Sequence, residues 1–116
     1  MLTAAWISRD YIPDDSLLLR FNLPRFRPGN FEANLRLSER MQEIARKKRC
    51  TPAQLVINWT RALSERMHGL SAIPIPGCTT VGRVVENSKL VGLTSEDMAE
   101  THDVVSQFVP ARTWYP

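Results

Sequence analysis

The most informative stretch of this chain is residues 73–87, whose sequence is Ile73-Pro74-Ile75-Pro76-Gly77-Cys78-Thr79-Thr80-Val81-Gly82-Arg83-Val84-Val85-Glu86-Asn87. A short apolar run with β-branched residues predicts a strand over residues 71–75, and Pro76-Gly77 predicts its end in a tight turn. Because Pro74 has no N–H to donate, one side of this strand must be unpaired or lie at the strand's end. The stretch therefore predicts a strand, a turn rich in hydroxyl groups and the start of a helix.

The residues after the turn are suited to an anion. A helix N-terminus presents free N–H groups and the positive end of the helix dipole. Thr79 and Thr80 add hydroxyl donors, and Arg83, one turn into the helix, can make paired bonds to phosphate. Asn87 follows on the same helical face. Spacing alone also fits an ordinary strand–turn–helix unit in which a threonine caps the helix, so both interpretations stay open at this point.

Three further segments are predicted to be helical. Apolar residues recur at helical spacing from Phe31 to about Lys48. A capping box of Thr51 and Gln54, with proline at the first helical position, predicts a second helix that ends before Gly69. The helix that opens after Thr80 is expected to run from about Val81 to Leu90. The last helix starts at Thr94 and continues to about Phe108.

The remaining parts are expected to be irregular, namely residues 1–30 and the tail 109–116. A single strand cannot form a sheet, and its backbone groups need partners if they are buried. The pattern therefore indicates a piece of something larger, or a chain that needs another chain.

Composition excludes several classes of function. The net charge of +3 is too small to imply nucleic acid by itself, and 43% hydrophobic residues is ordinary for a globular chain. The basic run 46–49 fits the negative end of a helix dipole; a nucleic-acid patch is the alternative interpretation. Two cysteines and two histidines form no metal-ligand spacing; they are Cys50, Cys78, His68 and His102. No segment has the length and apolarity of a membrane span, so we expect no membrane contact and a cytoplasmic location.

The stretch 73–87 resembles the signature of the aldo-keto reductases, in which an Ile-Pro-Ile-Pro-Gly strand leads to a Thr/Lys corner, an Arg and then Glu-Asn. The resemblance implies that this segment binds the 2′-phosphate and adenine of NADP(H). Arg83 would hold the 2′-phosphate and stack beside the adenine, which Glu86 and Asn87 would contact. The implied cofactor-binding residues are Gly77, Cys78, Thr79, Thr80, Arg83, Glu86 and Asn87.

The resemblance extends over residues 2 to 108 in the family's order. Cys50-Thr51-Pro52-Ala53-Gln54-Leu55 resembles the helix before the eighth strand, and Leu93-Thr94-Ser95-Glu96-Asp97-Met98 resembles the start of the final helix. The implied fold class is α/β: the C-terminal fragment of a (β/α)₈ TIM barrel. The chain would be mostly helical with about one barrel strand, and residues 31–108 would hold the last helices and the eighth strand. A complete barrel needs roughly 250 residues, whereas this chain has 116.

Two positions depart from the family's pattern. Cys78 stands where Ser or Thr is usual, and Thr80 stands where this branch often has Lys. The loss of a cation beside a 2′-phosphate weakens the preference for NADP(H) over NAD(H), by roughly tenfold or more in affinity if one charge-assisted bond is lost.

The family reduces carbonyl groups by hydride transfer from the nicotinamide, with a catalytic set of Asp, Tyr, Lys and His from the first half of the barrel. No motif that matches this set occurs here, so no catalytic residue is assigned and the chain's status as an enzyme stays open. The substrate is open for the same reason. The expectation is a truncated, reductase-like protein that retains only the segment that binds the adenosine end of the cofactor.

The alternative is a non-enzymatic interaction module that docks on an intact reductase or another partner. Without the rest of a barrel, the helices would expose apolar residues, among them Leu55, Trp59, Val84 and Phe108. Such faces favour self-association or a partner protein.

Overall fold

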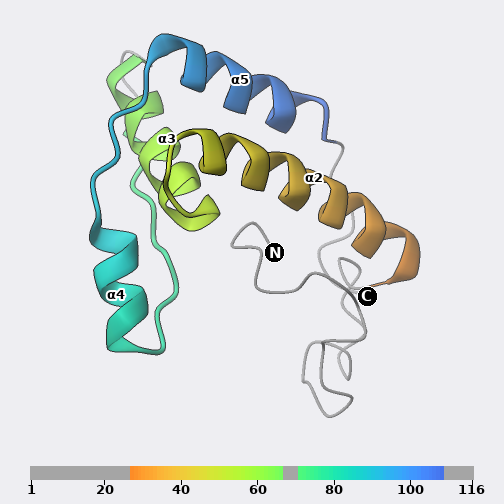
Figure 1. Ribbon diagram of the computed structural model, residues 1–116, viewed down its shortest axis with the longest axis horizontal. Helices are drawn as coiled ribbons and strands as arrows, with labels where there is room; N and C mark the ends of the chain where they lie inside the picture. The colour runs from red at the N-terminus through yellow and green to blue at the C-terminus, as the bar shows by residue number, and fades with distance from the viewer. Residues whose placement is uncertain (1–26, 67–70, 109–116) are drawn as a thin grey trace.

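Four α-helices make up most of the residues that the structure describes, which are 27–66 and 71–108 of this computed structural model. In chain order they are α2 (Pro28–Lys47), α3 (Pro52–Arg66), α4 (Val81–Ser88) and α5 (Ser95–Ser106). Helices α2, α3 and α5 pack together, whereas α4 packs chiefly against α3 and lies apart from the other two (Figure 1). Most of residues 1–30, the tail 109–116 and His68 fall outside the described residues, so the predictions for them stay predictions.

Helix α2 begins three residues earlier than the sequence predicted. Pro28 occupies the start of the helix, where its fixed φ suits the first turn and its missing N–H is not needed. The N–H of Phe31 donates to the carbonyl of Arg27 at 2.8 Å and closes that turn. The prediction of irregular structure through residue 30 was therefore wrong for residues 28–30, because a proline that stops a helix in its middle favours one at its start.

The end of α2 is a tight reversal built on Arg49. Arg49 has φ of 52°, in the left-handed region that glycine usually fills. Its N–H donates to the carbonyl of Arg46 at 3.1 Å, and the N–H of Cys50 donates to the carbonyl of Ala45 at 3.0 Å. These two bonds form a Schellman motif, so the chain turns directly into α3.

The predicted capping box of Thr51 and Gln54 is present, and Thr94 and Asp97 form a second one at the predicted start of the last helix. In α3 the Gln54 N–H donates to the Thr51 hydroxyl at 3.2 Å, and the Thr51 N–H donates to the Gln54 side-chain oxygen at 3.1 Å. In α5 the side chain of Thr94 accepts from the Asp97 N–H, and the Asp97 carboxylate accepts from the Thr94 N–H at 2.7 Å. Sequence thus specified both helix starts, because these bonds are local.

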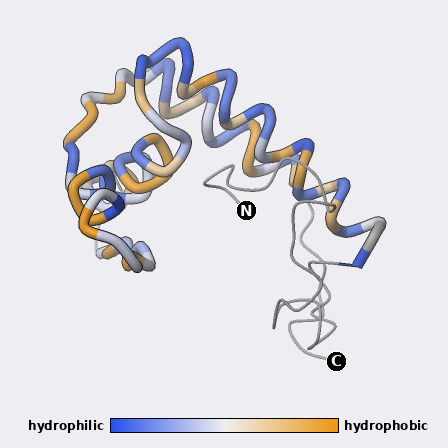
Figure 2. The backbone as a smooth tube through the Cα atoms, turned by 60° about the horizontal axis from the view of Figure 1, so that its bottom comes forward, coloured by the Kyte–Doolittle hydropathy of each residue, from blue (hydrophilic) through white to orange (hydrophobic). Residues whose placement is uncertain are grey.

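The hydrophobic core lies where α2, α3 and α5 meet. Met41, Ile44, Ala45, Leu55 and Val104 form one buried cluster. Hydrophobic residues recur along the described helices, as Figure 2 shows. The prediction that Leu55 would be exposed was wrong, since 0% of its surface is accessible. The three helices bury their apolar stripes against one another without any barrel wall, and each buried Leu or Ile contributes roughly 1.5–3 kcal/mol.

The predicted strand at residues 71–75 is absent. Residues 71–78 form no helix or strand and run as an uncoiled segment from α3 to α4 (Figure 1). A strand exists only when a neighbour accepts its hydrogen bonds, and within the described residues no other strand exists to pair with it. The fold of the described residues is therefore mostly helical; it is compatible with a piece of a barrel, but a barrel is not shown.

The basic run at the end of α2 is engaged in ion pairs with α5. The Lys47 ammonium lies 2.7 Å from the Glu100 carboxylate, and the Lys48 ammonium lies 2.8 Å from that of Asp97. These pairs hold the end of α2 beside the first half of α5, so half of the run serves the fold rather than an external polyanion. As for membranes, none of the helices in the described ranges combines the length and apolarity needed to cross one.

Candidate functional site

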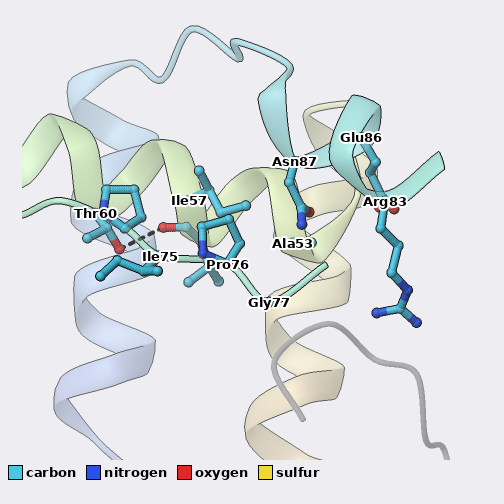
Figure 3. Close-up of a pocket in the computed structure, with 11 residues that line it drawn as sticks. Ala53, Ile57, Thr60, Ile75, Pro76, Gly77, Arg83, Glu86 and Asn87 are labelled. Atoms are coloured by element: carbon cyan, nitrogen blue, oxygen red, sulfur yellow. Dashed lines mark hydrogen bonds between the residues drawn. The ribbon is translucent and has the colours of Figure 1, made fainter. Parts of the chain in front are cut away.

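A groove of about 380 Å³ lies between α3, the segment before α4 and α4 itself. Four of the seven residues that the sequence singled out line it, namely Gly77, Arg83, Glu86 and Asn87. Cys78, Thr79 and Thr80 are exposed at its margin and do not line it. Figure 3 shows these residues from α4 at one end of the groove, with Ile75 and Thr60 toward the other.

The opposite wall of the groove comes from α3, and the sequence analysis did not assign it to the site. Ala53, Val56, Ile57 and Thr60 line it, at the i, i+3, i+4 and i+7 spacing of one helical face. The Thr60 hydroxyl donates to the carbonyl of Val56 at 2.8 Å, so its polar atom is satisfied inside the helix (Figure 3). That spacing was readable in the sequence, but it could not show that this face turns toward the 73–87 stretch.

Two buried amides of α3 fix the end of α4. The Gln54 side chain donates to the carbonyl of Glu86 at 3.1 Å, and the Asn58 side chain donates to the carbonyl of Lys89 at 3.0 Å. Both amides are buried, so loss of these bonds would leave polar groups without partners, at about 1–3 kcal/mol each. One carbonyl in the last turn of α4, that of Glu86, and the carbonyl of the capping residue Lys89 are thereby satisfied.

The N-terminus of α4 is capped by Thr80. The Thr80 hydroxyl accepts from the Arg83 N–H at 3.3 Å, and the Thr80 carbonyl accepts from the Val84 N–H at 3.2 Å. The free N–H groups of the first turn remain directed out of the helix beside two exposed threonines. This geometry is that of an ordinary capped helix, and it is also compatible with an anion at the helix start, which stays a prediction.

The Arg83 side chain is exposed and extends away from the Thr60 end of the groove (Figure 3). Its guanidinium has no carboxylate partner within residues 27–66 and 71–108. An arginine that no carboxylate neutralises is available to a dianion that approaches the start of α4.

Cys78 and Asn87 contact each other across the mouth of the groove. The Asn87 amide donates to the Cys78 sulfur at 3.1 Å, and the thiol lies 3.5 Å from the carbonyl of Pro76, to which it donates. The departure from Ser or Thr at this position therefore keeps a hydrogen-bonding group. Among the described residues, no group donates a hydrogen bond to the amide oxygen of Asn87, so this oxygen can accept one from a ligand.

The groups with shifted pKa values lie around α5 and the end of α2, and none of them lines the groove. Partial burial, the largest influence on Asp97, raises its pKa, but hydrogen bonds from Lys48 and Thr94 outweigh it and lower the pKa below the usual value. The Glu100 hydrogen bond and charge raise the pKa of Lys47. Burial raises the pKa of the Cys50 thiol, so this cysteine is not an activated nucleophile. In the part of the chain that the structure describes, no cluster of His, Cys, Asp and Glu is suited to a metal ion.

Helix α4 has its polar side turned toward the groove and its apolar side turned to solvent. Arg83, Glu86 and Asn87 line the groove, whereas Val81 and Val85 are 81% and 67% exposed. No residue of α4 is buried. The expectation that Val84 would be exposed is confirmed, at 50%. Trp59 and Phe108, expected to be exposed with it, are half-buried.

Comparison with known proteins finds a reductase among the relatives of this chain. The chain is similar to a protein named "Aldo-keto reductase" from Gibberella moniliformis (strain M3125 / FGSC 7600), with 34% identity over 103 residues. That match covers 87% of this chain but only 28% of the reductase. Sixteen curated proteins match significantly, so the similarity does not depend on a single sequence. No family model matches the chain, and no solved structure matches it.

The match supports a partial relationship to the aldo-keto reductases. It agrees with the resemblance that the sequence suggested, and it extends well beyond the 73–87 stretch. Since the chain spans little more than a quarter of the relative's length, the activity and cofactor of the whole reductase are matters for proposal.

Proposed function

We propose that this chain is a reductase-like fragment whose segment 77–87 binds the 2′-phosphate and adenine end of NADP(H). The observation that carries the proposal is the position of the Arg83 guanidinium, which no carboxylate neutralises, one turn into a helix whose start offers N–H groups and threonine hydroxyls. The likeness to an aldo-keto reductase supports the choice of nucleotide.

The geometry suits the adenosine end of a dinucleotide. The 2′-phosphate would lie at the start of α4, between the exposed threonines and Arg83. The adenine would enter the groove, where Asn87 and Glu86 present polar atoms and Ile57 and Ile75 present apolar surface. The residues assigned here contact only the adenosine end, so the proposal includes no hydride-transfer step and no catalytic residue.

The test is a calorimetric titration of the full chain with 2′,5′-ADP and, separately, with 5′-AMP. We expect 2′,5′-ADP to bind more tightly, and Arg83→Ala to remove most of that advantage. The loss of one charge-assisted pair corresponds to roughly tenfold or more in Kd. Arg83→Lys is the matched control, because it keeps the positive charge but cannot make the two parallel hydrogen bonds of a guanidinium. Equal binding of both nucleotides, or no effect of Arg83→Ala, would remove the proposed phosphate contact.

A second candidate function is an interaction module, and the outward-facing apolar side of α4 favours it. A helix that turns valines to water and polar residues inward presents an exposed apolar face of the kind that marks interaction sites. Co-purification of the tagged chain with a defined partner would support this function, whereas a stable monomer that retains no partner would argue against it.

A further inference from the structure

All the strongly exposed large hydrophobic residues within 27–66 and 71–108 gather in one region, which we call the outward surface. They are Ile73, Ile75, Val81, Val84, Val85 and Leu90. None lies on α2, α3 or α5. The segment 71–78 and α4 lie side by side (Figure 1), and residues of both line the groove. The outward surface is therefore confined to residues 73–90, and within it Ile75 also lines the groove.

The backbone of segment 71–77 has one occupied edge. The Ser64 hydroxyl accepts from the Ala72 N–H at 2.6 Å and donates to the Ala72 carbonyl at 2.9 Å. In an extended chain the backbone groups of alternate residues point to the same edge. Ala72, Pro74 and Pro76 therefore share an edge, on which Ser64 holds the first residue and the two prolines have no N–H.

On the opposite edge, which we call the open edge, the backbone donors and acceptors are not paired with other backbone groups of the described chain. It carries the N–H and C=O groups of Ile73, Ile75 and Gly77, and residues 71–79 make no backbone–backbone hydrogen bond within the described chain. Ile73 and Ile75 each precede a proline, which disfavours the helical region for them and favours β or polyproline II conformations. A strand-like edge is thus set in advance, and pairing costs less conformational entropy than it would for a free loop.

We propose that a second copy of this chain covers the outward surface, by antiparallel pairing of the two open edges with Ile75 opposite Ile75 of the other copy. In that register Ile73, Ile75 and Gly77 exchange hydrogen bonds with Gly77, Ile75 and Ile73 of the second copy. Pro74 and Pro76 fall at positions that need no N–H. A two-stranded ribbon alone is marginal in water, and the valines of α4 supply the further apolar area.

Two features select a second copy rather than another sheet. The open edge is self-complementary about Ile75, as an interface with twofold symmetry requires. The occupied edge cannot add a further strand, so the assembly stops at two chains. An intact barrel, in contrast, is closed and offers no free edge. The proposal names the partner for the interaction function above and does not depend on nucleotide binding.

The first test is sedimentation velocity of the full chain over a range of concentrations. We expect a monomer–dimer equilibrium, weakened at least tenfold by Ile75→Pro, which removes the central N–H and keeps an apolar side chain. Ile75→Val is the matched control and should dimerise like the parent. Val85→Lys should also weaken the dimer, because it places a charge on the outward surface. Val85 is 67% exposed, so its replacement leaves the monomer's packing intact.

The second test addresses the register. With Ile75 at the twofold axis, position 72 lies opposite Cys78 of the other copy, in a pair whose Cα atoms are about 4.5 Å apart. Within one extended chain the same positions are about 20 Å apart and cannot be bridged. Mild oxidation of Ala72→Cys should therefore give a disulfide-linked dimer, and the Ala72→Cys/Cys78→Ser control should not.

The outcomes decide the proposal. A chain that stays monomeric at several hundred micromolar overturns it, even if that chain captures a different partner and so retains an interaction function. A dimer that Ile75→Pro leaves unchanged overturns strand pairing. A dimer in which the control cross-links as readily as Ala72→Cys overturns the register.

Discussion

The bundle of α2, α3 and α5 and the segment 71–90 follow opposite rules of burial. In the bundle the apolar faces meet, and Met41, Ile44 and Leu55 are almost wholly buried. In segment 71–90 the polar side of α4 faces the groove and the valines face solvent. The bundle closes on itself, whereas the segment is held in place by polar bonds. The difference shows that, among the described residues, one part of the chain buries its apolar side chains and the other presents an exposed apolar surface.

The largest expected effect comes from removing one buried side chain from the bundle. Leu55→Ala should destabilise the chain by about 2–5 kcal/mol, because it deletes transfer energy and leaves a cavity. Val85→Ala, the matched change in the segment, should stay within about 0.5 kcal/mol. Urea denaturation of dilute chain, followed by circular dichroism, measures both. Equal losses for the two variants would mean that the bundle and the segment do not differ as described.

A smaller effect is expected where the two regions join. Gln54→Glu keeps the capping bond from the Thr51 N–H but replaces the donor to the Glu86 carbonyl with an acceptor. We expect a loss of about 1–3 kcal/mol, confined to the attachment of α4. Hydrogen exchange should accelerate in α4 and stay unchanged in α2. Acceleration throughout the bundle would show that α4 is part of the cooperative core.

The smallest effect concerns the ion pair of Lys48 and Asp97 within the bundle. The pKa of Asp97 is lowered in the folded chain, so its contribution is present above the unfolded carboxyl pKa of about 3.9 and is lost as pH falls through the folded value. Asp97→Asn should therefore cost up to about 1 kcal/mol near pH 6, and the difference from the parent should vanish near pH 2.

The control for this last change is Glu96→Gln, an exposed position one residue away. It should leave the pH dependence of unfolding almost unchanged. If Asp97→Asn gave the same difference at pH 2 as at pH 6, the stabilisation would come from packing or capping rather than from the carboxylate charge. Thermal unfolding at both pH values measures it.

Local signals in the sequence predicted the helices well. Both capping boxes, with Gln54 and Asp97 as third residues, are present because their bonds span only four residues. The start of α2 at Pro28 was missed, since Arg27-Pro28-Gly29-Asn30 resembles a turn when no neighbours are considered. Seven residues of the 73–87 stretch were predicted to share a site, and four of them line one groove. The α3 wall of that groove was missed because it depends on packing.

What the sequence determined by itself was the order of the helices, their caps and the anion-suited start of α4. These depend on propensity and on bonds between residues a few positions apart. The tertiary structure alone decided that Leu55 is buried, that segment 71–78 pairs with no strand among the described residues, and that α4 turns its valines outward. Those outcomes depend on which surfaces are available to pack or to pair, and no single stretch of sequence contains its own partner.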